Sequence, residues 1–171
     1  MLGKIITYYG EGEGKTTAAI GHAIRILGHK KKVAIIQFMK GRQDTGEYRI
    51  LKKTKGIKIY LCGAPKFLKG KEYRKEHYEK VNQGLGIAEI FVEEQKIDLL
   101  VLDEVLYAIK FRLIKEKEVL DLIDKRGKIN IILTGRNPGK EILKRSDITT
   151  KVKEIKHHYK KDKETVEGLD Y

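Results

Sequence analysis

The feature that most constrains this chain is a glycine-rich loop that follows an apolar run near the N-terminus. Ile5-Ile6 lead into GEGEGKTT at 10–17, and a helix-like segment continues from Ala18. Glycines let backbone N–H groups close around phosphate oxygens, and a helix N-terminus adds partial positive charge. A strand, a glycine loop, Lys-Thr and a helix in this order predict a site for a nucleoside triphosphate.

The loop is shorter than the common phosphate-binding loop, which has Gly, four residues and then Gly-Lys-Ser/Thr. That spacing would require glycine at position 9, where Tyr9 stands, and Gly10 is one residue too close. A glycine-rich surface turn is the competing interpretation, but it leaves the Lys-Thr-Thr and the flanking strand and helix unexplained. We expect Lys15 to reach the outer phosphates and Thr16 to hold magnesium. The loop residues expected to bind nucleotide are Gly10, Glu11, Gly12, Glu13, Gly14, Lys15, Thr16 and Thr17.

Length and composition fit one globular domain, 1–171, with 40% hydrophobic residues. No apolar stretch approaches the roughly 18 residues of a membrane helix, and no signal peptide is evident, so we expect a cytoplasmic protein without membrane contact. The single Cys62 cannot form an internal disulfide, which suits a reducing compartment. We expect Cys62 to fill the core rather than to act as a nucleophile.

The net charge of +13 admits two interpretations. A basic chain can bind nucleic acid. Charged residues at 36% and the absence of tryptophan are equally typical of a heat-adapted or compositionally biased proteome. Because the lysines are scattered rather than clustered, and because a polyphosphate is already an anionic partner, nucleic acid is not expected as the main ligand.

Apolar runs alternate with helical patterns, which predicts an α/β fold: a mostly parallel sheet of about six strands with helices on both faces. The expected strands are 3–9, 32–38, 56–61, 97–103, 128–134 and 148–155. The expected helices are 15–27, 46–54, 71–96, 116–125 and 138–144.

Polar groups stand where the predicted strands end, and ligands bind beyond the carboxyl ends of parallel strands. The second strand ends in QFMKG, with Gln37 and Lys40, and the fifth ends in Thr-Gly-Arg136. The fourth strand ends in Asp103-Glu104, a pattern that places a carboxylate beside the magnesium of a nucleotide. Together these residues predict a site for a magnesium nucleotide at one edge of the sheet.

The sequence shows no zinc-type Cys/His spacing and no serine elbow. His157-His158 in the tail are expected to be exposed polar residues rather than ligands. With no protein nucleophile in evidence, the pattern favours direct transfer between ATP and a second substrate.

These motifs together resemble the ATP:corrinoid (cob(I)alamin) adenosyltransferase family of the CobA/CobO/BtuR type. The resemblance spans nearly the whole chain, and the shortened loop and the chain's ending are its most specific parts. It rests on GEGEGKTTAA at 10–19, AIRILGHKKKV at 23–33, QFMKG at 37–41, GE at 46–47, VLDE at 101–104, ILTGR at 132–136, Asp147, KHHY at 156–159 and GLDY at 168–171.

The resemblance implies a RecA-like P-loop fold of three layers. It also implies transfer of the 5′-deoxyadenosyl group of ATP to cobalt(I) of a corrinoid, with release of triphosphate. Lys15, Thr16 and Glu104 would then be catalytic, and Thr16 with Asp103 or Glu104 would hold Mg²⁺ (or Mn²⁺). In this family the nucleotide lies reversed relative to ordinary P-loop enzymes. The family also implies a homodimer and a flavoprotein reductant.

The chain departs from the family pattern at three places. The family's usual N-terminal extension, which forms a lid over the corrinoid, is not expected here, because Met1 falls just before the first predicted strand. Glu11 and Glu13 replace the usual Asn and Lys, and carboxylates beside a polyphosphate are unfavourable unless they point outward or meet magnesium or lysines. Of the family's Phe-Thr-Trp element only Phe67 lies nearby, and it is the candidate corrinoid contact. The resemblance implies that the corrinoid is cobalamin or a precursor such as cobinamide or cobyrinic acid diamide.

Two other functions stay open on the residues alone. A generic P-loop ATPase or kinase would yield ADP rather than triphosphate. A nucleic-acid-associated ATP-binding protein would show turnover that is stimulated by DNA or RNA and depends steeply on salt.

Overall fold

The computed structural model describes residues 1–64, 70–157 and 165–169, and these form an α/β fold around a parallel sheet. Across that part of the chain the sheet has six strands in the order β3-β2-β4-β5-β1-β6. The strands are β1 (Ile5–Tyr9), β2 (Val33–Phe38), β3 (Ile57–Cys62), β4 (Leu99–Asp103), β5 (Asn130–Gly135) and β6 (Ile148–Lys151). The helices are α1 (Lys15–Gly28), α2 (Gly46–Leu51), α3 (Gly70–Glu94), α4 (Val105–Lys110), α5 (Glu116–Asp124) and α6 (Lys140–Arg145).

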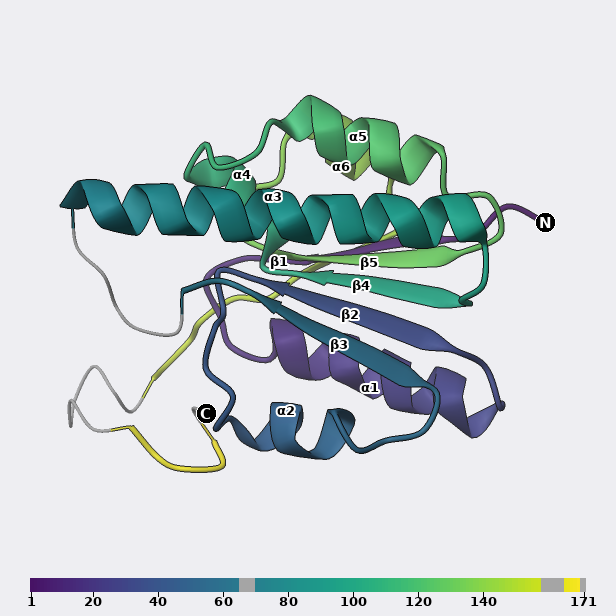
Figure 1. Cartoon of the computed structure of the whole chain (residues 1–171), viewed down its shortest axis with the longest axis horizontal. Coiled ribbons are helices and arrows are strands. Elements are labelled where there is room, and N and C mark those ends of the chain that lie inside the picture. The colour runs from purple at the N-terminus through teal and green to yellow at the C-terminus, as the bar shows by residue number, and fades with distance from the viewer. Residues whose placement is uncertain (65–69, 158–164, 170–171) are drawn as a thin grey trace.

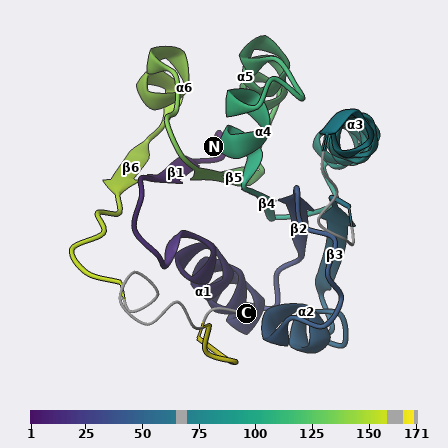
Figure 2. The same cartoon turned by 90° about the vertical axis from the view of Figure 1, so that its left-hand side faces the viewer.

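The sheet is the middle of three layers. In Figures 1 and 2, α1 and α2 cover one face, and α3, α4, α5 and α6 cover the other. Each face has its own apolar cluster: Ala19 and Ala23 of α1 pack under Ile35 and Val101, whereas Phe38 faces the α3 side. Since both faces are covered, β2 and β4 are buried along their whole length, as expected for strands of a parallel sheet.

The strand order decides where the loop lies relative to the acidic residues. β5 separates β1, which leads into the glycine loop, from β4, which ends at Asp103. This RecA-like order confirms the predicted fold class. The carboxyl ends of the strands lie at the left edge in Figure 1, and Figure 2 looks onto that edge.

The sequence predicted every strand of the described sheet, but it missed one helix. α4 follows β4 after a single residue and spans only Val105–Lys110, which is too short for a helical apolar period to be recognised. Several boundaries also differ from those expected, and α2, for example, ends at Leu51 rather than at Thr54. The last helix begins at Lys140, because Gly139 after Pro138 is extended, and the last strand ends at Lys151 rather than at Ile155.

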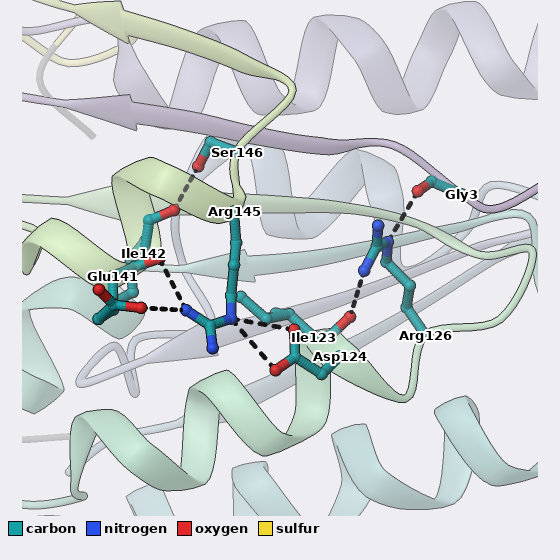
Figure 3. A network of polar contacts seen from close by, with 8 residues as sticks. All are labelled: Gly3, Ile123, Asp124, Arg126, Glu141, Ile142, Arg145 and Ser146. Atoms are coloured by element: carbon teal, nitrogen blue, oxygen red, sulfur yellow. Dashed lines mark hydrogen bonds and ion pairs between the residues drawn. The ribbon is translucent and has the colours of Figure 1, made fainter.

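A polar network at the edge opposite the loop fixes the ends of α5 and α6 (Figure 3). Arg145 donates to Asp124 at 3.1 Å and to Glu141 at 2.6 Å, and so ties the two helices together. Arg126 donates to the carbonyl oxygen of Gly3 at 2.7 Å, which anchors the chain just before β1. Among the described helices none is both long and apolar enough to cross a bilayer.

Cys62 ends β3 inside the core, which agrees with its predicted packing role. Its side chain is buried, and burial raises the pKa of the thiol to about 11. We therefore predict that a thiol reagent such as DTNB modifies the native protein at neutral pH at least about a hundredfold more slowly than it modifies the denatured protein. Equal rates in the two states would contradict this burial.

Candidate active site

The glycine loop closes tightly between β1 and α1. Gly10 has φ 123°, and a Cβ there would lie 2.2 Å from the carbonyl oxygen of Val152, so this position requires glycine. The Gly10 amide donates to the Gly135 carbonyl at 3.1 Å, and the Gly12 amide donates to the Val152 carbonyl at 3.0 Å. The loop is therefore held in place by the end of β5 and by the segment after β6.

The N-terminus of α1 is open toward the loop. Gly14 is its N-cap in the left-handed region, and no side chain caps the helix. The first amides of a helix have no partner within it, so they are available to an anion. Thr17 is exposed on this first turn. The N-terminus of α1 thus has the geometry expected of a phosphate site.

Lys15 is folded back over the loop. Its side chain is buried, and its ammonium group donates to the Gly12 carbonyl at 2.6 Å. Burial lowers the pKa of Lys15, although the nearby Glu104 carboxylate opposes that shift. A phosphate in the loop would offer this buried cation a stronger acceptor than the neutral carbonyl oxygen it now contacts.

Asp103 is the residue on which the other polar side chains converge. Its Oδ1 accepts hydrogen bonds from Thr16 at 2.9 Å and from Thr134 at 2.7 Å. Its Oδ2 accepts from Gln37 at 3.1 Å and from Lys40 at 2.9 Å. These four donors come from α1, β5, β2 and the turn after β2, so one carboxylate joins four segments of the chain.

The charges at this junction balance each other. Burial alone would raise the pKa of Asp103, but Lys40 and the hydrogen bonds from Thr134, Lys40 and Thr16 hold that pKa below its ordinary value. Burial likewise disfavours the Lys40 ammonium, but the adjoining carboxylate outweighs it and raises the Lys40 pKa. Lys40 also donates to the Thr16 hydroxyl at 3.2 Å, so a cation already stands beside the oxygen predicted to hold the metal ion.

Glu104 differs from its neighbour because its carboxylate is not satisfied. It has φ 60°, an uncommon left-handed backbone, and its amide donates to the Thr134 hydroxyl at 2.8 Å. Its Oε2 is buried and has no hydrogen-bond partner within the described structure. Burial and the charge of Asp103 raise its pKa. A cation bound at this oxygen would relieve both penalties.

Arg136 extends from the end of β5 toward the loop. Gly135 before it has φ 137°, and a Cβ there would lie 2.8 Å from Cβ of Leu106, so glycine lets the chain pass close to α4. The guanidinium group forms an ion pair with Glu11 of the loop. It also lies 5.3 Å from the ring centroid of Tyr107 on α4. Arg136 therefore lies beside the loop, and its contact with phosphate stays a prediction.

The segment after β6 packs across the loop. A Cβ on Gly12 would lie 2.8 Å from the backbone of Lys153, and His157 Nε2 lies 2.6 Å from Glu13 Oε1. The side chain of His157 is only 17% exposed, so the expectation that it is an exposed polar residue was wrong. Glu11 and Glu13, the two loop residues that differ from the family pattern, have side chains that are more than half exposed. Glu11 contacts Arg136 and Glu13 contacts His157, rather than lysines.

The structure brings most of the predicted residues together and adds three that sequence reasoning missed. Thr134, Tyr107 and His157 each contact a predicted site residue. Thr134 stands near the carboxyl end of a predicted buried strand, close to Arg136 in the sequence. That position could have indicated a site residue. Tyr107 lies on the unpredicted α4. Phe67, His158 and the last two residues of the GLDY ending lie outside the described residues.

The fold and the glycine loop define a P-loop nucleotide-binding protein. The family model of ATP:corrinoid adenosyltransferase BtuR/CobO/CobP matches residues 2–171. The chain therefore belongs to the ATP:corrinoid adenosyltransferase family, as its motifs indicated.

Several proteins named as corrinoid adenosyltransferases are similar to this chain over most of their length. The corrinoid adenosyltransferase of Escherichia coli strain K12 is 30% identical over 170 residues, which cover 99% of this chain and 86% of the relative. The corrinoid adenosyltransferase CobA of Salmonella typhimurium is also 30% identical, with the same coverage. That of Pseudomonas aeruginosa is 26% identical and is covered to 84%. Domain III of the Thermotoga maritima replication initiation protein DnaA superposes with a TM-score of 0.44 at 13% identity, over 88% of this chain and 55% of that chain.

Because Asp103 joins four segments, we predict that Asp103→Asn destabilises the protein by about 3 kcal/mol at neutral pH, since it leaves the Lys40 cation without its partner. The folded pKa of Asp103 lies below the unfolded one. Its stabilisation is therefore complete above the unfolded value of about 3.9 and is lost as pH falls through the folded pKa.

Chemical denaturation of the parent and of Asp103→Asn, at a series of pH values from neutral downward, measures the free energy of unfolding of each protein. The difference in unfolding free energy should narrow below about pH 4. Asp121→Asn, at an exposed carboxylate on α5, is the matched control. A difference between Asp103→Asn and the parent that stays constant down to low pH would contradict the role given to the ionised carboxylate.

Proposed function

We propose that this protein transfers the 5′-deoxyadenosyl group of ATP to cobalt(I) of a corrinoid. The cobalt electron pair forms the new cobalt–carbon bond at C5′. The C5′–O5′ bond breaks, its electron pair leaves with inorganic triphosphate, and cobalt is formally oxidised from +1 to +3. The observation that carries this proposal is that Thr16 donates to Asp103 while Lys15 and Arg136 interact electrostatically with Glu104, in a chain of this family.

The protein's own residues hold the leaving group. Triphosphate gains negative charge as the C5′–O5′ bond breaks, and fixed donors aimed at that charge lower the barrier. The open amides at the start of α1, the buried Lys15 and Arg136 supply those donors. No side chain acts as nucleophile in this scheme, because cobalt(I) is one. The enzyme contributes alignment of C5′ with the metal of its substrate.

The residues present fit a magnesium ion. Glu104 Oε2 is buried and has no hydrogen-bond partner within the described structure, and the Thr16 hydroxyl is oriented by its hydrogen bond to the neighbouring Asp103 at 2.9 Å. Since both oxygens of Asp103 already accept two hydrogen bonds each, we assign the direct contacts to Thr16 and Glu104 and the supporting role to Asp103. When bound, Mg²⁺ supplies charge neutralisation at the phosphates.

Further proposals concern the surroundings of the reaction. Residues 1–171 would act as one cytoplasmic domain, as a homodimer, and a flavoprotein would supply the electrons that produce cobalt(I). The corrinoid would be cobalamin or a precursor, with Phe67 as the candidate contact.

The test of the proposed reaction is incubation with ATP, magnesium and chemically reduced cobalamin. The corrinoid spectrum should change to that of a light-sensitive cobalt–carbon species. One molecule of triphosphate should form for each cobalt–carbon bond. ADP and phosphate without any change at cobalt would instead indicate the ATPase or kinase.

Replacing the loop lysine tests the assignment of the leaving-group site. Lys15→Ala should lower the rate of adenosylation about a hundredfold or more, because a positioned cation at the developing charge is lost. Lys31→Ala, in the exposed turn between α1 and β2, is the matched control and should retain the parent rate. Near-parent activity of Lys15→Ala would contradict the assignment.

Glu104→Gln tests the metal contact and its pH dependence. The variant should need about tenfold more Mg²⁺ for half-maximal rate, since a neutral amide binds the ion less well. In the parent, the raised pKa of Glu104 keeps its protonated form present at higher pH than usual. The Mg²⁺ requirement should therefore rise as pH falls through that pKa, and this rise should be absent in the variant. The same requirement at every pH in both proteins would exclude the contact.

A further inference from the structure

We infer that Glu11 competes with triphosphate for Arg136 and thereby promotes product release. This inference rests on the proposed function. The product keeps all three phosphates of ATP and carries more negative charge once it is free. The contacts that the site makes with the phosphates of ATP therefore hold the product at least as strongly, and an enzyme of this kind needs some means of releasing it.

The ion pair between Glu11 and Arg136 is placed to provide that means. Glu11 belongs to the phosphate-binding loop itself, and Arg136 approaches from the end of β5. Their side chains are 58% and 33% exposed, so a dissolved anion can reach the pair beside the loop. An anion that enters the loop meets a guanidinium group already occupied by a carboxylate.

The pairing leaves Arg136 incompletely satisfied. Its Nε is buried and has no hydrogen-bond acceptor within the described structure. A guanidinium group has five N–H donors, and a triphosphate offers more oxygens in a suitable geometry than one carboxylate does. Substrate and product can therefore displace Glu11, while Glu11 remains tethered close by to reclaim the cation.

Tyr107 keeps Arg136 in place during this exchange. The guanidinium carbon lies 5.3 Å from the centroid of the Tyr107 ring, which stacks on Phe111 with centroids 5.8 Å apart. Because this contact does not involve the loop, it persists whichever anion Arg136 binds. Arg136 thus has a fixed position and two alternative anionic partners.

The other loop glutamate, Glu13, is not placed to compete for Arg136. It carries the same charge two residues along, but its carboxylate contacts His157 in the segment after β6. The two glutamates therefore differ in their partner and not in their charge, which provides a matched pair of variants.

The test is calorimetric titration of the full chain with inorganic tripolyphosphate and magnesium. Glu11→Gln should tighten binding about three- to tenfold, which is the range expected for loss of a partly exposed competing carboxylate. Glu13→Gln should tighten it less. In an Arg136→Gln background, Glu11→Gln should have no effect beyond that of Glu13→Gln, because the cation for which Glu11 competes is gone.

Kinetics supply a second readout. With Glu11→Gln, the inhibition constant of tripolyphosphate and the KM for ATP should both fall, and kcat should fall as release slows. Equal tightening by the two glutamate variants, or an undiminished Glu11 effect in the Arg136→Gln background, would overturn the inference. The titrations contain no corrinoid, so a failure to form the cobalt–carbon product would count against the proposed function alone.

Discussion

The rest of the site depends on the hydrogen bonds that the ionised carboxylate of Asp103 accepts. This carboxylate is buried at the end of β4 and accepts four hydrogen bonds, from Thr16, Thr134, Gln37 and Lys40. The strand register accounts for one of these donors, because Gln37 on β2 pairs with Asp103 on β4 in the sheet. The carboxylate thereby positions the start of α1, and with it the loop and Lys15, against the edge where the strands end.

A site built for polyphosphate would normally avoid acidic residues, yet this loop contains two. The structure shows how they are tolerated. Each is more than half exposed, and each contacts a basic side chain from a different segment, Arg136 for Glu11 and His157 for Glu13. Backbone hydrogen bonds to Gly135 and Val152 also hold the loop, so its shape does not rest on the contacts of these side chains alone.

Much of this arrangement could be predicted because it follows from chain topology. Parallel strands end at one edge, so the residues after β1, β2, β4 and β5 had to meet there. The contacts that sequence reasoning missed have a different origin. Tyr107 lies on a helix of less than two turns, which has no readable period, and His157 reaches Glu13 across 144 positions through an irregular segment. Neither propensity nor spacing encodes a contact of that kind.

The central claim is that the loop immobilises the triphosphate so that the ribose carbon, not the terminal phosphorus, faces the second substrate. A crystal structure of the protein with ATP, magnesium and a corrinoid tests this most directly. The three phosphates should contact Lys15 and the first amides of α1, with C5′ directed at cobalt. A nucleotide in the conventional orientation, with a water or hydroxyl aligned on the γ-phosphorus, would contradict it.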